Sequence, residues 1–68
     1  MAITLYTLPN CGICNMVKTK LHQKNISFEE QPFENIATII NSNQAPALKV
    51  EDNIYNSPSA IVKWINEQ

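Results

Sequence analysis

The sequence predicts an α/β fold in which strands and helices follow one another in the order β-α-β-α-β-β-α. Three observations predict this order: apolar and polar residues alternate near the start, helical spacing recurs in three later segments, and turn-forming residues separate the segments. The 68 residues allow one domain, spanning residues 1–68. Hydrophobic residues make up 44% of the chain and charged residues 16%, which is typical of a globular protein rather than a disordered one.

The first two expected elements are a strand and a helix. Residues 3–8 alternate apolar and polar side chains, which predicts a strand, and Pro9 ends it. Residues 12–24 predict a helix, because an apolar stripe recurs every four residues, at Ile13, Val17 and Leu21. The outer side of this helix is expected to carry three lysines: Lys18, Lys20 and Lys24. Asn25 tolerates a left-handed backbone conformation and is the expected end of the helix.

The middle of the chain predicts a short strand, a second helix and a loop. Residues 26–30 form the expected strand, which Pro32 ends. Residues 34–42 predict a helix, because isoleucines recur at helical spacing, at Ile36, Ile39 and Ile40. Residues 41–44 are all Asn, Ser or Gln and are expected to form a loop.

The last third of the chain predicts a hairpin and a final helix. Residues 47–50 and 53–55 are the expected strands, and residues 51–53 the turn between them. Ser57 and Pro58 fit the N-cap and first position of a helix over residues 58–67. The apolar stripe of this helix, expected to be buried, contains Ile61, Trp64 and Ile65.

Composition excludes several functions. The chain has five Lys and no Arg against six acidic residues, and a net charge of −1. A nucleic-acid-binding surface needs a basic face, so we expect no nucleic-acid partner. We also expect no membrane association, because no apolar run approaches the roughly 20 residues of a spanning helix. The first basic residue is Lys18, which does not fit a secretory signal, and we therefore expect a cytoplasmic protein.

The two cysteines are the most informative residues of the chain. Cys11 and Cys14 are separated by Gly12 and Ile13, and the group lies between the first expected strand and the first expected helix. Free backbone N–H groups and the helix dipole at a helix N-terminus favour the thiolate, which is the nucleophilic form. We therefore predict that Cys11, at the very end of the helix, attacks a substrate disulfide. Cys14, facing inward, would resolve the mixed disulfide.

Two other interpretations of the cysteines are open. In the first, the pair is a static disulfide or two inert buried thiols. In the second, the cysteines bind zinc, which usually takes four protein ligands. The chain offers only two Cys and one His, and His22 lies two helical turns beyond Cys14. A zinc site within one chain is therefore disfavoured, whereas a metal shared between two chains stays open.

The segment Gln44-Ala45-Pro46-Ala47, just before the third strand, has two readings. A proline at the start of a strand is ordinarily trans. A cis proline here would pack its ring against the cysteine pair. Only about 5–6% of X–Pro bonds are cis in folded proteins, so the residues by themselves favour the trans form.

Together, Cys11-Gly12-Ile13-Cys14, the Ala45-Pro46 pair and the order of elements resemble the thioredoxin superfamily. Within it, the chain is similar to glutaredoxin-like proteins. It is most similar to the NrdH-type redoxins, through residues 7–11, Cys14-Asn15 and Gln44-Ala45-Pro46. The resemblance implies a thioredoxin/glutaredoxin-like fold, a four-stranded mixed sheet flanked by three helices. It also implies that Cys11 is the nucleophile, that Cys14 resolves, and that the Ala45–Pro46 bond is cis.

The resemblance also implies partners. The Ala45 backbone would pair with a substrate as an added strand, and Gly12 and Ile13 would form an uncharged, partly apolar lip around Cys11. NrdH-type redoxins take electrons from thioredoxin reductase and pass them to a ribonucleotide reductase, whereas glutaredoxins take theirs from glutathione. Ser57 and Ser59, at the start of the last helix, are candidate residues for binding an anion.

Departures from both branches bear on the electron donor. The Cys-Pro-Tyr-Cys of glutaredoxins is absent, Tyr55-Asn56 replaces their Gly-Gly, and Ser59 replaces the acidic residue that helps hold glutathione. Residues 55–58 also match the corresponding stretch of the NrdH-type redoxins only loosely. Without Arg, only Lys could hold the carboxylates of glutathione. These departures favour a protein reductase over glutathione.

The sequence therefore predicts a cytoplasmic, monomeric dithiol–disulfide oxidoreductase with no bound organic cofactor, which reduces protein disulfides through a redox-active Cys11–Cys14 disulfide. A ribonucleotide reductase is one expected target. Three alternatives stay open: a glutathione-dependent glutaredoxin, an inert thioredoxin-like domain, and a module that bridges an iron–sulfur cluster or zinc between two chains.

Overall fold

A four-stranded mixed sheet lies at the centre of the computed structural model, which describes residues 2–41 and 44–68. The strands are β1 (Ile3–Thr7), β2 (Glu29–Pro32), β3 (Ala47–Val50) and β4 (Asn53–Tyr55), arranged in the order β2-β1-β3-β4. β1 is parallel to β2 and antiparallel to β3, and β4 forms a hairpin with β3. The sequence of elements is the predicted β-α-β-α-β-β-α.

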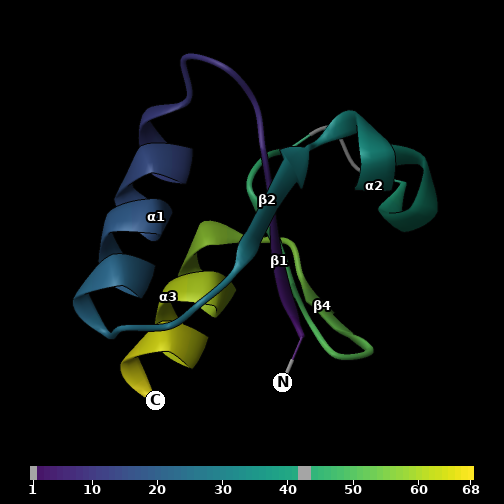
Figure 1. The fold of residues 1–68 in the computed structure, drawn as a ribbon. Helices are drawn as coiled ribbons and strands as arrows, with labels where there is room; N and C mark the ends of the chain where they lie inside the picture. Colours follow the sequence, from purple (N-terminus) through teal and green to yellow (C-terminus); the bar gives the residue numbers. More distant parts are fainter. Residues whose placement is uncertain (1, 42–43) are drawn as a thin grey trace.

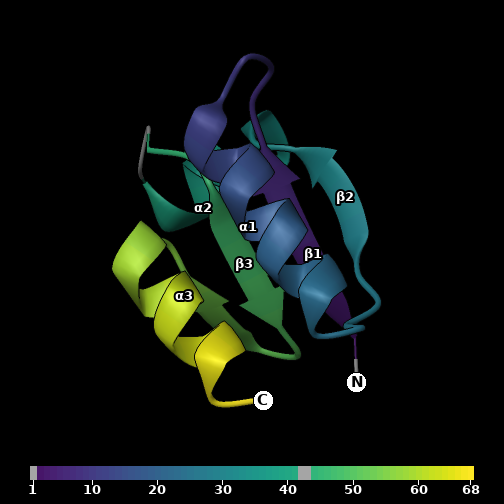
Figure 2. The same ribbon diagram turned by 90° about the vertical axis from the view of Figure 1, so that its left-hand side faces the viewer.

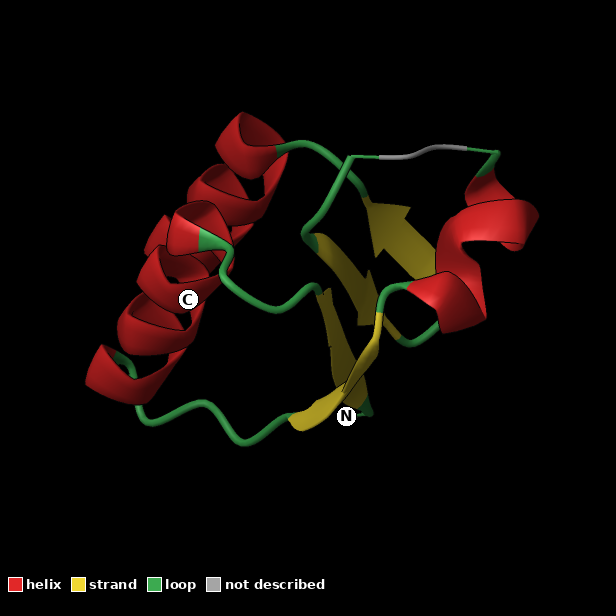
Figure 3. Ribbon diagram, turned by 90° about the horizontal axis from the view of Figure 1, so that it is seen from above, coloured by secondary structure: helices red, strands yellow, loops and turns green. Residues whose placement is uncertain are grey.

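The helices are α1 (Gly12–Gln23), α2 (Glu34–Ile40) and α3 (Pro58–Asn66). α1 and α3 cover one face of the sheet, whereas α2 covers the other (Figure 1). Seen from above, the helices and the sheet form three layers (Figure 3). α1 and α3 lie side by side in front of the strands and contact each other (Figure 2). This arrangement is the thioredoxin-like fold that the family resemblance implied.

The register of the sheet places the candidate site at one end of it. Tyr6, near the end of β1, pairs with Ala47, the first residue of β3. Because the two strands are antiparallel, the segment that precedes β3 lies beside the segment that follows β1. Ala45 and Pro46 are therefore at the same end of the sheet as the loop that leads to Cys11.

The main core lies between the sheet and the pair α1 and α3. It consists of aliphatic side chains from four elements, β1, α1, β3 and α3: Ile3, Leu5, Val17, Leu21, Leu48, Val50, Ile61 and Ile65. Fully burying such a side chain contributes roughly 1.5–3 kcal/mol, so this cluster is the chief source of stability. A smaller cluster under α2 contains Tyr6, Phe33, Ile36 and Ala47.

The second strand differs from the prediction. The expected strand covered residues 26–30, but β2 runs from Glu29 to Pro32 and consists mostly of exposed residues. Ile26 and Phe28 pack against the main core in the segment before the strand, which explains their misleading alternation. Pro32 was expected to lie beyond the end of this strand, but it is the last residue of β2. An edge strand tolerates proline, because one side of its backbone has no strand to pair with.

Three apolar stripes differ in detail from the prediction. Ile13 is 46% exposed, and Cys14 takes the inward position in the first turn of α1. Ile39 is 72% exposed, because the face of α2 that packs against the sheet is formed by Ile36, Ala37 and Ile40. Trp64 is half-buried rather than buried, with its ring tilted against Tyr55. Of the expected lysines, Lys18 and Lys20 are half-buried and Lys24 is exposed.

Outside β2, the element ends that the structure describes follow the prediction closely. Residues 8, 24 and 67 lie just beyond the observed ends of β1, α1 and α3, and the bounds of β3 and β4 are as predicted. The expected end of the second helix at residue 42, and residues 42–43 of the expected loop, lie outside the described residues. Among the described residues, three asparagines at element ends have left-handed conformations, Asn10, Asn25 and Asn41, which suits asparagine better than most residues.

Candidate active site

Cys11 is the N-cap residue of α1. Its backbone is extended (φ −104°, ψ 108°), and its Sγ accepts a hydrogen bond of 3.1 Å from the backbone N–H of Cys14. The sulfur therefore occupies the position that a Ser or Asp oxygen takes at an ordinary N-cap. The left-handed Asn10 (φ 58°) turns the chain from the loop after β1 into this cap.

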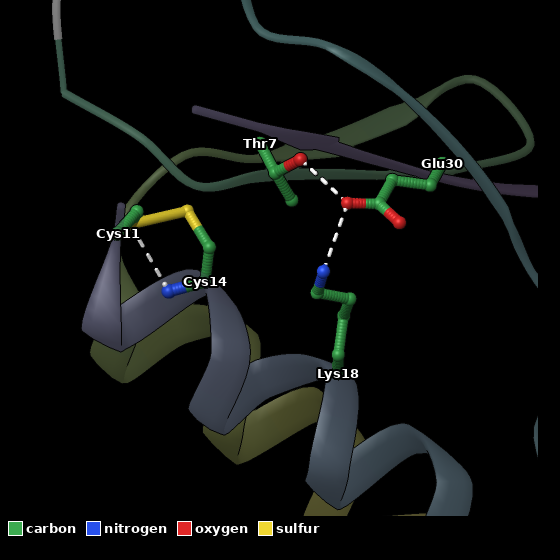
Figure 4. Close-up of a disulfide and its surroundings, with 5 residues drawn as sticks. All are labelled: Thr7, Cys11, Cys14, Lys18 and Glu30. Atoms are coloured by element: carbon green, nitrogen blue, oxygen red, sulfur yellow. Dashed lines mark hydrogen bonds and ion pairs between the residues drawn. A yellow bond between two sulfur atoms is a disulfide. The ribbon is translucent and has the colours of Figure 1, made fainter. Parts of the chain in front are cut away.

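Cys14 lies one turn further on and is 1% exposed, whereas Cys11 is half-buried rather than fully exposed. The two sulfurs are joined as a disulfide, with Cα atoms 5.2 Å apart (Figure 4). The cap conformation of Cys11 brings its sulfur back over the first helical turn, toward Cys14. The pair is thus asymmetric, with one partner reachable and the other enclosed.

The environment of Cys11 favours the thiolate once the disulfide is reduced. The cap hydrogen bond points a backbone N–H at the sulfur, and the positive end of the helix dipole lies at the same place. The first turn of α1 contains no acidic residue that would oppose a negative charge. Both features support the predicted role of Cys11 as the nucleophile.

Gly12 and Ile13 form the outer surface of the first turn. Both are exposed, and a Cβ added to Gly12 would meet nothing within 4 Å apart from its chain neighbours and the backbone of its own helix. The space beside Gly12 is therefore open to an approaching partner. With the half-exposed Ile13, this surface is the uncharged lip expected from the sequence.

The Ala45–Pro46 peptide bond is cis, as the resemblance implied. Pro46 is fully buried, and Ala45 is half-buried against the cluster under α2. Since Ala47 pairs with Tyr6, these residues flank the cysteine loop on the β3 side. Pairing of the Ala45 backbone with a substrate stays a prediction.

Ser57 and Ser59 lie at the start of α3. The Ser57 hydroxyl accepts a hydrogen bond of 3.3 Å from the Ala60 backbone N–H, so this serine is the N-cap that the sequence predicted. Ser59 is exposed. Within the described residues, no hydrogen bond joins either serine to the cysteines, and a role in anion binding stays a prediction.

The structure also reveals a polar cluster that sequence reasoning missed. The Oε2 atom of Glu30 accepts a hydrogen bond of 2.7 Å from the Thr7 hydroxyl and lies 3.1 Å from the Lys18 ammonium (Figure 4). The hydrogen bond from Thr7 and then the one from Lys18 lower the pKa of Glu30 below its ordinary value of 4.5. Lys18 lies one turn beyond Cys14 on α1, so the ion pair is close to the disulfide in the fold.

A shallow groove of about 460 Å³ runs beside the cysteine loop. Its walls are residues 7–10, the α1 residues Asn15 and Lys18, and residues 30–32 of the edge strand β2. Because β2 and β3 lie on opposite sides of β1, this groove and Ala45–Pro46 flank the loop from opposite sides.

Neither a metal site nor a membrane span emerges from the described part of the chain. Within residues 2–41 and 44–68, no three His, Cys, Asp or Glu side chains are grouped so that they could hold a metal ion. None of the helices in these ranges has the length and hydropathy needed to cross a bilayer.

Comparison with known proteins places this geometry in a family. The sequence model of the glutaredoxin family matches residues 3–52, which include both cysteines, Ala45 and Pro46. The chain belongs to the glutaredoxin family. The cysteine pair at the start of α1 is the Cys-x-x-Cys arrangement of a redoxin-type thiol–disulfide oxidoreductase. No curated protein matches the sequence.

Solved structures extend the comparison. The NrdH-redoxin of Escherichia coli, a glutaredoxin-like protein, superposes with a TM-score of 0.70 at 21% identity, covering 93% of both chains. Glutathione transferase F7 from Populus trichocarpa gives a TM-score of 0.76 at 29% identity, covering 97% of this chain. The glutathione S-transferase from Ascaris lumbricoides gives 0.76 at 18% identity, covering 98% of it.

These likenesses differ in extent. This glutaredoxin-family chain spans only 35% of each transferase, so it is similar to a part of those enzymes. It spans nearly the whole of NrdH-redoxin. At 21% and 18% identity, NrdH-redoxin and the Ascaris enzyme show the shared fold and nothing finer.

Proposed function

We propose that this protein is a dithiol–disulfide oxidoreductase that reduces protein disulfides through Cys11 and Cys14. The observation that carries the proposal is the asymmetry of the pair. Cys11 is the reachable, N-capping sulfur, and Cys14 is enclosed one turn below it. An inert structural disulfide needs neither a cap position for one sulfur nor an open surface beside Gly12.

In the reduced protein, the Cys11 thiolate attacks one sulfur of the substrate disulfide. A bond forms between Cys11 and that sulfur, the substrate S–S bond breaks, and the departing thiolate takes a proton from water. Cys14 then loses its proton to solvent and attacks the Cys11 sulfur. This second step releases the other substrate thiol and closes the Cys11–Cys14 disulfide, so two electrons have passed to the substrate.

For the electron donor, we propose a protein reductase of the thioredoxin reductase type. Residues 7–11 and Gln44-Ala45-Pro46 resemble the motifs of the NrdH-type redoxins, which take electrons from thioredoxin reductase. The glutaredoxin residues that help bind glutathione are also absent. Tyr55 and Asn56 replace the Gly-Gly pair, and Ser59 replaces the acidic residue. The proposal locates the protein in the cytoplasm, with a ribonucleotide reductase as one candidate target.

Glutathione is the competing donor, and one observation favours it. The Populus glutathione transferase matches 97% of the chain at 29% identity. Ser57 and the free backbone N–H groups at the start of α3 would then receive a carboxylate of the tripeptide.

One experiment separates the two donors. The oxidised protein is incubated either with millimolar glutathione or with NADPH and catalytic thioredoxin reductase. The protein is alkylated at intervals, and the fraction with free Cys11 and Cys14 thiols is read from its mass. We expect reduction by the reductase to be the faster. Ready reduction by glutathione with none by the reductase would reverse the ranking.

A further inference from the structure

The groove beside β2, here named the β2-side groove, is formed by residues 7–10, Asn15, Lys18 and residues 30–32. We propose that it is a docking subsite for an extended, uncharged segment of a protein disulfide substrate, adjoining the substrate cysteine that bonds to Cys11. The inference rests on the proposed oxidoreductase function and deepens it by naming the kind of substrate segment that is recognised.

Chain connectivity places the groove next to the reacting sulfur. Asn10 immediately precedes Cys11 and Asn15 immediately follows Cys14, and both line the groove. The backbone carbonyl of Cys11 also accepts a hydrogen bond of 3.1 Å from the Asn15 N–H. An extended chain advances about 3.3–3.6 Å per residue. Two or three residues beyond a cysteine bonded to Cys11 would therefore lie over this groove.

The groove offers hydrogen-bonding groups that suit a peptide backbone. The side-chain amides of Asn10 and Asn15 are exposed and have no hydrogen-bond partner among the described residues. Each amide provides both donors and an acceptor, which match the C=O and N–H groups of an extended chain. Leu8, 45% exposed, adds apolar surface at the same wall.

The charges in the groove indicate what kind of segment fits. Lys18 and Glu30 pair with each other at 3.1 Å, and Thr7 holds the same carboxylate oxygen of Glu30 (Figure 4). A charged side chain on the substrate would find its counter-charge already paired. It would also lose part of its hydration on entering the groove. The Lys18–Glu30 ion pair in the groove therefore favours an uncharged substrate segment.

The groove also predicts a difference between large and small substrates. The Ala45 edge and the β2-side groove lie on opposite sides of the cysteine loop. A disulfide flanked by peptide chains can reach both sides, whereas a small organic disulfide reaches neither fully. Changes in the groove should therefore alter kcat/KM for peptide disulfides more than for a small disulfide.

The main test fills the groove. Asn15→Phe places a ring in it from an exposed helical position, and Gln23→Phe places the same ring at the exposed far end of α1 as a matched control. Pre-reduced proteins react in single turnovers with a disulfide-linked peptide whose cysteines are flanked by Ala and Ser, and with 2-hydroxyethyl disulfide. We expect the peptide-to-small-disulfide rate ratio to fall about tenfold in Asn15→Phe and to stay at the wild-type value in Gln23→Phe.

A second pair of variants tests the charge argument. Glu30→Gln leaves Lys18 unpaired, and Lys18→Gln leaves Glu30 unpaired. We expect the first variant to prefer peptides with Asp flanks and the second to prefer peptides with Lys flanks, each by about threefold over the wild type.

The outcomes separate this inference from the function on which it rests. Unchanged rate ratios in all these variants, with the wild type reducing both disulfides, would overturn the subsite and leave the oxidoreductase intact. A wild type that reduces neither disulfide would instead overturn the proposed function. If both Phe variants lower the ratio equally, the effect comes from the ring itself and the subsite is rejected.

Discussion

On the face of the sheet that α1 and α3 cover, aliphatic side chains from four elements form one enclosed cluster. The face under α2 has a smaller cluster, and α2 leaves Ile39 72% exposed. The two halves of the candidate site depend on different faces. Cys14 is buried on α1, the helix that contributes Val17 and Leu21 to the main core, whereas Ala45 packs against the cluster under α2.

This difference indicates a division of labour. The cysteine pair begins a helix that the main core fixes, so the attacking and resolving sulfurs keep their geometry. The Ala45–Pro46 edge, which is expected to pair with the substrate, depends on fewer contacts. We therefore expect substitutions in the main core to lower the free energy of unfolding. Substitutions in the cluster under α2 should alter substrate binding first.

The largest effect should come from the cysteines themselves. Cys11→Ser removes the nucleophile and should abolish disulfide reduction altogether. Cys14→Ser should instead leave Cys11 able to react and trap it in a mixed disulfide, visible as a mass increase that dithiothreitol reverses. The roles would be wrongly assigned if iodoacetamide labelled Cys14 before Cys11 in the reduced wild-type protein.

The next largest effect should come from the main core. Leu21 is fully buried between α1 and the sheet, and Leu21→Ala should lower the free energy of unfolding by about 3 kcal/mol. A chain of this length has a total stability of only roughly 3–10 kcal/mol. The urea concentration at the midpoint of unfolding should therefore fall strongly. Leu21→Met keeps most of the volume and should cost less than about 1.5 kcal/mol. Equal losses in the two variants would contradict a packing origin.

A smaller loss of stability, with a specific loss of function, is expected under α2. Ile36 is 1% exposed and belongs to the cluster that supports Ala45. Ile36→Ala should cost about 2 kcal/mol and raise KM for a protein disulfide, while the alkylation rate of Cys11 stays unchanged. Ile39→Ala, at an exposed position of the same helix, should change stability by less than about 0.5 kcal/mol. If Ile36→Ala slowed the alkylation of Cys11 and left KM unchanged, the proposal that the two faces have different roles would be wrong.

The comparison also explains how much the sequence could predict. The order of elements and the role of Ser57 as a cap follow from local patterns that tertiary contacts did not override. The cysteine pair was recognisable because its position between a strand and a helix is itself a local pattern. The cis form of Ala45–Pro46 could be expected only through family resemblance, since no local signal distinguishes it from trans.

The polar cluster beside the disulfide escaped prediction for a different reason. Lys18 looked like a solvated helix residue and Glu30 like the end of a strand placed three residues too early. Their meeting depends on the register in which β2 lies beside β1, with Leu5 opposite Glu30. That register is set by long-range pairing of an exposed edge strand, which leaves no apolar pattern in the sequence.

This ion pair gives the smallest expected effect, and it depends on pH. Because its partners lower the pKa of Glu30 below 4.5 in the folded state, the folded protein holds this proton less tightly than the unfolded chain. The resulting stability is fully present above about pH 4.5 and is lost as the pH falls through the lower, folded-state pKa. Glu30 is largely exposed, so solvent screening limits the effect to about 0.5 kcal/mol or less.

Urea denaturation of the wild type and Glu30→Gln at several pH values measures this contribution. The difference between the two proteins should be constant near neutrality and vanish in acid. Glu29→Gln is the matched control, because Glu29 carries the same charge on the same strand and has no ion pair among the described residues. It should therefore show a smaller difference near neutrality. A Glu30→Gln difference that persisted unchanged in acid would mean that the Thr7 and Lys18 contacts stabilise the strand by packing rather than by charge.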